Sequence, residues 1–499
     1  MPPPAAKPAD AADAPSSRRL FFSIFPSIVL PMFLASVDQT IVATALPAIA
    51  AELGEVERVS WIVVAYLVAA TIAAPVYGRL GDALGRRRML FVALGLSLIA
   101  YVACALATSV SMLIAARVLL GFGGGGLMTL THALMGESIP PRERGRFQGY
   151  MASVFVCSSM FGPVAGGWLT QHWGWRSVFL INLPLACLAV LLAFRLPRKP
   201  VGDSRTPFDY LGTLLFAGFI APALMALERV RHFDLAEAPL AAGLAAVATA
   251  SLLLLRQERR TSHPLLPVTF LRQTAVWRTN TLAACLGASL VSMITFLPIY
   301  LSVARGTSPG ETGLLMLPLT ALIAVGSMVT GRTMSVTGRT AIIPSLALPV
   351  VACLMLVMAV LGPTISLSHL PFLLGGIALF MGSGMPVVQV TVQMLAGQKQ
   401  LGAAAASVQF SRSIGAAVGT AVVGAVLFAA LAATDPEAAS LFGRIIQQGQ
   451  TALAGIPPDR VAVIQAEITG AFRAAFLAIA AFAAMAAVMA WSIPLRRIG

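Results

Sequence analysis

The chain has 499 residues, of which 58% are hydrophobic and only 11% are charged, and its mean hydropathy is +0.85. This balance excludes an ordinary soluble domain and indicates an all-α integral membrane protein. The formal charge of +14 does not indicate a nucleic-acid partner, because the arginines are scattered through short loops between apolar segments, where membrane topology accounts for them.

The elements expected in chain order are membrane-spanning helices. An Ala- and Pro-rich cytoplasmic tail over residues 1–21 is expected to be disordered. A hydrocarbon core of roughly 30 Å needs roughly 20 helical residues to cross it. With both termini in the cytoplasm, Lys and Arg concentrate in the cytoplasmic loops, which supports an even number of spans. The fourteen expected spans are 22–47, 58–78, 89–108, 111–135, 148–170, 176–195, 209–228, 237–255, 279–303, 312–331, 341–361, 369–391, 403–430 and 470–494.

The first span carries Asp38, with apolar sequence on both sides. A carboxylate in hydrocarbon is costly unless it is protonated, paired or hydrated, so a buried one by default marks a proton or substrate path. Asp38 is therefore a candidate proton-coupling residue of a transporter.

Residues 78–88 join the second and third spans and carry Gly78, Asp82, Gly85, Arg86 and Arg87. Their order, G-x-L-x-D-x-x-G-R-R, resembles the cytoplasmic loop signature of the major facilitator superfamily. Glycines permit a tight turn, and the aspartate can meet a helix N-terminus or an arginine in one conformation and leave it in another, which is a gating role. The alternative is a positively charged anchor that only sets orientation.

The fourth span contains Arg117 in a segment that resembles the superfamily's arginine motif, although Leu120 stands where a glutamine is common. The depths of Asp38 and Arg117 allow a direct or water-bridged meeting. A nearby cation favours the carboxylate and desolvation favours the acid, so movement of the arginine could change the proton affinity. The alternative is a static ion pair that holds two helices together.

The fifth span contains Gly162, Pro163, Gly166 and Gly167, which resemble the antiporter motif of proton-driven exporters, with Ser158 where that motif begins with glycine. Small residues and a Gly-Pro step allow close packing and bending, so a hinge or leak barrier is expected. The segment from Asp38 to Pro47 is similar to the pattern D-x-T-I-V-x-x-A-L-P of the fourteen-span drug:proton antiporter branch, with Ala43 in place of a common asparagine.

The second half holds few ionisable groups within its spans, and its polar and adaptable side chains are candidates for a substrate cavity. Methionines at such positions are more often packing than substrate contacts. Arg412 is either a cavity charge or a structural donor to backbone carbonyls, and the structural role is favoured. The candidate cavity residues are Gln389, Gln393, Gln409, Arg412, Phe296 and Met293.

No other site chemistry is expected. The five cysteines show no disulfide or zinc-ligand spacing, and no metal cluster, Walker-type phosphate loop or catalytic triad is apparent, so an enzyme is not expected. No cofactor is expected either, and the energy source is a proton gradient or transport is passive.

The resemblance implies two six-helix bundles, at residues 22–196 and 269–494, with a linker over 197–268 that adds two transmembrane helices and a short tail over 495–499. It also implies a multi-pass protein of the cell (inner) membrane, a proton-coupled antiporter that exports hydrophobic or amphipathic small molecules, such as drugs, by alternating access. Neutral, zwitterionic or weakly acidic substrates are expected at least as much as multivalent cations. We expect a monomer whose partners are substrate and lipid; a periplasmic adaptor has no support in these residues. The alternatives are a proton-linked importer or facilitator of a metabolite, and a membrane sensor or scaffold.

Overall fold

The structure is a computed structural model, and it describes residues 17–54, 58–59, 61–197, 208–231, 237–261, 264–265, 268–435, 442 and 458–494. The predicted tail over 495–499 and most of the predicted tail over 1–21 lie outside the described residues. Helices account for nearly all of the described chain, which confirms the all-helical expectation. The helices before the linker are α1 (Ser17–Thr40), η1 (Ile41–Thr44), α2 (Leu46–Leu53), α3 (Trp61–Leu84), α4 (Arg86–Ala105), α5 (Val110–Ser138), α6 (Arg144–Trp173), α7 (Ser177–Leu180) and α8 (Asn182–Ala193).

The linker and the second half continue the same architecture. A π-helical segment, η3 (Tyr300–Ala304), extends α12, and a 3₁₀ turn, η4 (Gln398–Gln400), precedes α17. The remaining helices are α9 (Tyr210–Arg231), α10 (Glu237–Arg260), α11 (Val268–Leu271), α12 (Thr274–Ile299), α13 (Pro309–Thr337), α14 (Ile342–Leu361), α15 (Leu370–Met381), α16 (Gly384–Ala396), α17 (Leu401–Thr434) and α19 (Pro458–Ser492).

Twelve helices within the described residues are long and apolar enough to cross a membrane, so the prediction of fourteen spans is not confirmed. Two predicted spans account for the difference. The one predicted over 176–195 is broken into α7 and α8, and its apolar helical stretch, Ser177–Ala193, is shorter than the others. The one predicted over 237–255 lies in α10, which is not among the twelve.

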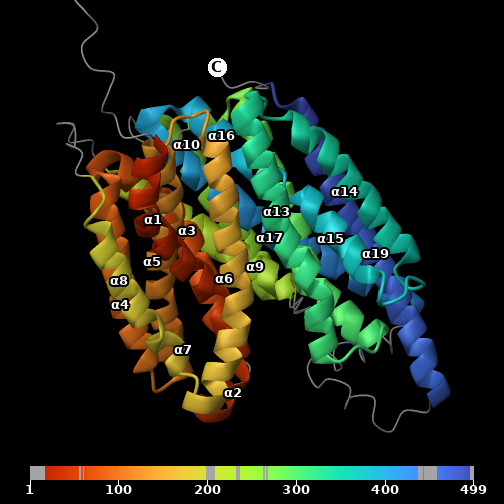
Figure 1. Cartoon of the computed structure of the whole chain (residues 1–499). Helices are drawn as coiled ribbons and strands as arrows, with labels where there is room; N and C mark the ends of the chain where they lie inside the picture. The colour runs from red at the N-terminus through yellow and green to blue at the C-terminus, as the bar shows by residue number, and fades with distance from the viewer. Residues whose placement is uncertain are drawn as a thin grey trace, which may run out of the picture.

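The helices form two halves, each with its own hydrophobic core. The first-half core draws on α1 to α8, between Ile28 and Leu196, and the second-half core on α11 to α19, between Phe270 and Ile493. Figure 1 shows the first half in red to yellow and the second in green to blue, with helices that converge at the top and diverge toward the bottom. The first turn of α1 and the last turn of α19 lie at the same end. The bundle boundaries given above remain predictions.

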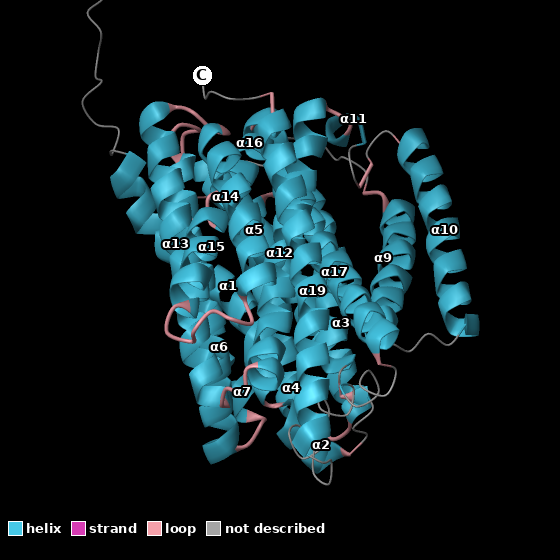
Figure 2. Ribbon diagram, turned by 90° about the vertical axis from the view of Figure 1, so that its right-hand side faces the viewer, coloured by secondary structure: helices cyan, strands magenta, loops and turns pink. Residues whose placement is uncertain are grey.

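The linker helices pack on the outside of this arrangement. Figure 2 shows α9 against the bundle and α10 beyond it, at the edge of the molecule. Phe216 and Ile220 of α9 are buried in a small apolar cluster with Ile72 of α3, and Phe410 and Ile414 of α17 pack against the same cluster. Helix α9 thus spans the seam between the first half and the second.

Candidate functional site

Asp38 is buried inside the first half, near the C-terminal end of α1, with only 1% of its surface exposed. Its two carboxylate oxygens each accept a hydrogen bond from a different helix. The Tyr101 hydroxyl of α4 donates to Oδ2 at 2.6 Å, and the Asn182 amide of α8 donates to Oδ1 at 3.0 Å. A buried carboxyl group is costly without such partners, so these two residues make the position tenable.

Arg117 of α5 lies beside Asp38 but contacts its main chain. Its Nη2 donates to the Asp38 carbonyl oxygen at 3.3 Å, and its Nε donates to the Ile62 carbonyl oxygen at 3.1 Å. The guanidinium also lies 4.3 Å from the centre of the Tyr66 ring. Among the described residues, Arg117 has no ion pair within 4 Å, and its Nη1 is buried without a hydrogen-bond partner. The two residues are therefore neighbours without a direct ion pair in this conformation.

The α-helical geometry of α1 stops two residues after Asp38, where the 3₁₀ turn η1 begins. Helix α6 packs against this turn through Gly162 and Gly166. A Cβ atom on Gly162 would collide with the Thr40 hydroxyl, and one on Gly166 would collide with the Ile41 carbonyl oxygen. These two glycines thus bring α6 against the backbone next to Asp38. The other two residues of the predicted motif, Pro163 and Gly167, lie on the outer side of α6.

The loop signature joins the two halves at the end of the bundle where α3 ends and α17 begins. Gly85 has φ +97°, a conformation that favours glycine, and lets α4 start directly after α3. The Asp82 carboxylate accepts hydrogen bonds from the backbone N–H groups of Gly402 at 2.9 Å and Ala403 at 3.1 Å, at the N-terminus of α17. A negative charge at a helix N-terminus is stabilising, so Asp82 fastens the halves together at this end.

Arg86 connects three segments around Asp82. It forms ion pairs with Asp82 at 2.6 Å and with Glu137 of α5 at 2.7 Å, and it donates to the Gln398 carbonyl oxygen. Arg87 instead donates to the carbonyl oxygens of Ala193 and Phe194, at the C-terminal end of α8, where the helix dipole favours a cation. We call this end of the bundle the closed end.

Small residues let the helices of the two halves touch at the closed end. A Cβ atom on Gly78 would lie 2.6 Å from the Gly402 carbonyl oxygen. Similarly, a Cβ atom on Gly145 of α6 would lie 2.8 Å from the Gly331 carbonyl oxygen of α13. Side chains larger than glycine at these positions would push the halves apart.

A cavity lies between the two halves, with an empty volume of about 880 Å³, its open mouth included. Helices of both halves line it, and most of the lining is apolar. The lining residues are Met32, Met128, His132, Gln148, Ala152, Phe155, Val156, Ser159, Leu290, Ile294, Thr320, Ile323, Ser327, Gly382, Met385, Pro386, Gln389, Val408, Gln409 and Arg412.

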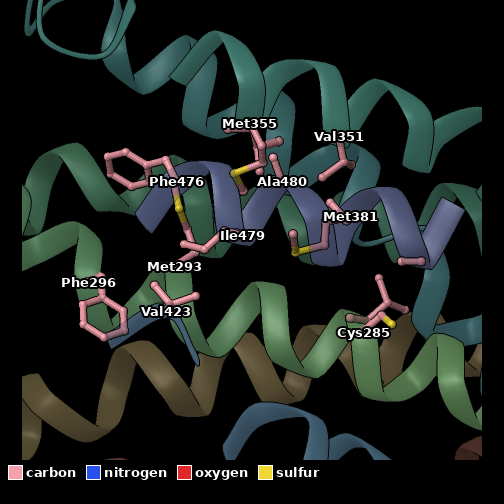
Figure 3. Close-up of a cluster of buried hydrophobic side chains, with 14 of the residues drawn as sticks. Cys285, Met293, Phe296, Val351, Met355, Met381, Val423, Phe476, Ile479 and Ala480 are labelled. Atoms are coloured by element: carbon pink, nitrogen blue, oxygen red, sulfur yellow. The ribbon is translucent and has the colours of Figure 1, made fainter. Parts of the chain in front are cut away.

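The predicted cavity residues fall into two groups. Gln389, Gln409 and Arg412 line the cavity. Gln393 does not, and instead its amide donates to the His132 carbonyl oxygen at 3.0 Å, a contact between α16 and α5. Met293 and Phe296 lie in the hydrophobic core of the second half, among residues such as Val423 and Phe476 (Figure 3).

Sequence reasoning missed several residues that the structure places at these sites. Tyr101 and Asn182 contact the Asp38 carboxylate, Glu137 contacts Arg86, and His132 and Gln148 line the cavity. The available signal was polarity within apolar segments of the first half. Polarity alone does not identify which of these groups meet in the folded chain.

Comparison with known proteins gives one family. A family model of the Major Facilitator Superfamily matches residues 28–420. An uncharacterized MFS-type transporter of Mycobacterium tuberculosis is 34% identical over 414 residues, which cover 81% of this chain and 59% of that protein. The chain thus spans less than two thirds of that relative's length. The multidrug transporter protein MdtP of Bacillus subtilis is 28% identical over 414 residues, which cover 81% of this chain and 75% of MdtP.

Solved structures of the same fold are more distant in sequence. The human organic anion transporter MFSD10 matches with a TM-score of 0.64 at 15% identity, over 96% of this chain and 100% of that one. The proton:xylose symporter XylE matches with a TM-score of 0.63 at 15% identity, over 96% of this chain and 97% of that one. At this identity the likeness concerns the fold alone.

Proposed function

The chain belongs to the major facilitator superfamily, and on that premise we propose that it exports hydrophobic or amphipathic small molecules in exchange for protons, by alternating access. Members of this family are multi-pass membrane transporters and not enzymes. The relatives named as a multidrug transporter, a multidrug resistance protein and efflux pumps, at 27–28% identity, support export. The single observation that carries the proton coupling is the buried Asp38 carboxyl group with its two hydrogen-bond donors.

In the proposed cycle, Asp38 is the proton carrier and Arg117 is its electrostatic partner. The Tyr101 and Asn182 donors hold the carboxylate form, whereas burial disfavours a charge. Arg117 keeps one buried N–H group free, so a small shift of α5 relative to α1 would let it reach the carboxylate. Such a shift would change the affinity of Asp38 for its proton between the two transport states.

Helix α6 is the proposed link between the proton site and the rocking motion. Its glycines pack on the 3₁₀ turn that follows Asp38, and 3₁₀ segments within helices often mark hinges. Near its N-terminal end, α6 packs against α13 of the other half through Gly145 and Gly149. A change at the proton site therefore has a continuous packed route to the interface between the halves.

The contacts of Asp82, Arg86 and Gly78 are the proposed gate. If both termini lie on the cytoplasmic side of the membrane, the closed end is the cytoplasmic end. The cavity is then open to the outer side in this conformation. Opening this end would break the hydrogen bonds that the Gly402 and Ala403 N–H groups donate to Asp82, and would expose the carboxylate and the N-terminus of α17 to water. The pair α7–α8 and helix α10 would supply the two further spans of the fourteen-span arrangement. The monomeric state is also proposed.

The test is Asp38→Asn in the full chain, assayed in everted vesicles with an imposed proton gradient. An amide at position 38 can still accept from Tyr101, and it can donate to the Asn182 Oδ1 atom, which is buried and without a partner here, so the variant should fold. We expect proton-driven uptake to be abolished while substrate exchange at equal concentrations persists. Asp209→Asn is the matched control, since Asp209 is also buried but lies beside α9, where it bonds Gly212 and Gln257.

Two results would contradict the proposal. Uphill, pH-dependent transport by a folded Asp38→Asn variant would remove Asp38 from the coupling step. Accumulation in right-side-out vesicles and not in everted ones would favour the importer.

A further inference from the structure

The cavity between the halves carries a positive charge, and no carboxylate of the described residues pairs with it. Arg412 of α17 donates to the Gln409 side-chain oxygen at 3.0 Å, and its guanidinium lies 5.2 Å from the centre of the Phe155 ring. Within the described residues, no carboxylate lies within 4 Å of Arg412, and no Asp or Glu lines the cavity. A cation in such low-polarity surroundings interacts strongly with any anion that enters.

Asp38 does not neutralise this charge. It is absent from the cavity lining, and both carboxylate oxygens are engaged within the first half. Met32, on the same helix, does line the cavity, but it lies six residues earlier, or roughly 9 Å along the helix axis. The proton site and the cavity are thus separate places.

Four further polar groups of the cavity lining have buried atoms without a hydrogen-bond partner. These are Nε2 of Gln148 and Gln389, Nδ1 of His132 and Oγ of Ser327. Gln148 and Gln389 are each only 5% exposed, and Ser327 is 1% exposed. Buried polar atoms are nearly always paired in folded proteins, so unpaired ones around a cavity indicate groups that pair with a ligand. A glutamine amide can present either end, whereas Arg412 only donates, so Arg412 sets the sign of the site.

The rest of the lining suits an apolar body. Methionine side chains from three helices, Met32, Met128 and Met385, adapt to varied shapes, and Leu290, Ile294 and Ile323 complete the apolar wall.

We propose that the cavity binds amphipathic organic anions, with the acidic head group on Arg412 and the Gln148 and Gln389 amides, and the apolar body against the methionine-rich wall. This inference rests on the proposed function for the direction of transport, but the binding step does not depend on proton coupling.

The test measures equilibrium binding to the full chain in nanodiscs, with binding to empty nanodiscs subtracted. Two probes share one aromatic body: 8-anilinonaphthalene-1-sulfonate is an anion, and N-phenyl-1-naphthylamine lacks the sulfonate. Tetraphenylphosphonium serves as the cationic probe. We expect the sulfonate to bind most tightly. Arg412→Gln, which keeps a side-chain amide near Gln409, should weaken sulfonate binding by about 10- to 100-fold and leave the neutral probe nearly unchanged.

Two variants separate charge from fold. Arg412→Lys keeps the charge and should retain the preference for the sulfonate over the neutral probe. Gln148→Leu should selectively weaken the binding of the sulfonate without changing the charge of the site. This variant replaces the Arg412 variants as the test if those do not fold. Tighter binding of tetraphenylphosphonium than of the sulfonate would overturn the proposal. The proposal would also be overturned if folded Arg412→Gln lost affinity equally for the sulfonate and for the neutral probe. If the Arg412 variants do not fold, the same result in Gln148→Leu would overturn it.

The proposed function can fail independently. Sulfonate binding that depends on Arg412, without proton-driven flux in vesicles, would support the anion site and reject the antiporter. Proton-driven flux of the cationic probe, with no Arg412-dependent binding of the sulfonate, would do the reverse.

Discussion

The Tyr101 hydroxyl donates a 2.6 Å hydrogen bond to Oδ2 of Asp38, and both residues are almost completely buried. A hydrogen bond to a charged group contributes about 1.5–3 kcal/mol. Tyr101→Phe should therefore destabilise the ionised form of Asp38 by an amount of that order. We expect the variant to lose proton-driven transport while its substrate binding stays intact. The check is to compare the initial rate of transport under an imposed proton gradient with the equilibrium affinity for substrate, in the variant and in the unmodified protein.

Tyr77→Phe is the matched control for that variant. Tyr77 lies on α3 and is also buried, but in the described part of the chain its hydroxyl has no hydrogen-bond partner. Equal effects of the two substitutions, or a loss of binding in Tyr101→Phe, would argue against a role in proton coupling.

At the closed end, Gly78→Val should shift the conformational equilibrium toward the open state. A Cβ atom there would lie 2.6 Å from the Gly402 carbonyl oxygen and 2.9 Å from the Ala406 Cβ. Overpacking of this kind costs about 1–3 kcal/mol, and the cost falls on the closed conformation alone. Spin labels on cysteines introduced at Leu84 and Lys399, both exposed at this end, should report a longer distance.

Gly95→Val provides the comparison, because a Cβ atom at Gly95 meets nothing within 4 Å. It should leave the distance distribution unchanged. An unchanged distribution in Gly78→Val as well would mean that this glycine contact does not hold the halves together.

A pH-dependent contact lies outside the spans, where Glu52 pairs with Arg176 and accepts a hydrogen bond from the Trp175 indole at 2.8 Å. The Arg176 and Trp175 hydrogen bonds lower the pKa of Glu52 below its ordinary value of 4.5. A lowered pKa in the folded state stabilises the fold above pH 4.5 and loses that contribution as the pH falls through the lowered value.

Glu52→Gln should therefore destabilise the protein slightly at neutral pH and flatten the acid side of its stability profile. The effect should be small because the pair is solvent-exposed. Thermal unfolding in detergent between pH 3 and pH 7, roughly the range over which a carboxyl group titrates, measures it. An acid limb as steep as that of the unmodified protein would contradict the assignment.

A pair of aromatic substitutions separates packing from substrate contact. Phe296 lies in the second-half core, whereas Phe155 lines the cavity beside Arg412. Phe296→Leu should lower the thermal stability, by less than the about 3–5 kcal/mol typical of Phe→Ala, and leave probe affinity unchanged. Phe155→Leu should lower the affinity for the aromatic probes. The opposite pattern would mean that Phe296, as the sequence first suggested, contacts substrate.

The polarity and spacing of individual residues predict the all-helical fold and the family. The buried Asp38, the glycines and charges of residues 78–88, and the apolar runs are properties of short segments, and lipid imposes strict rules on such segments. The all-helical fold and the family followed from these local features. The number of spans did not, because the stretch over 176–195 is apolar enough to span but is interrupted between α7 and α8.

Partners across the fold lay beyond sequence reasoning. Asn182 stands 144 residues from Asp38, and Gly402 stands 320 residues from Asp82, and no local pattern connects either pair. The surroundings of Met293 and Phe296 could not be predicted either, because an apolar side chain gives the same sequence pattern whether it faces a cavity or the hydrophobic core.

The amino-acid sequence by itself determined that this is a helical membrane transporter with one deep carboxylate and a charged loop signature, because membrane insertion and family motifs depend on neighbours along the chain. Only the tertiary structure decided which helices meet. It separated the Asp38 site from the cavity at Arg412 and closed one end of the bundle, since these features arise from contacts between segments hundreds of residues apart.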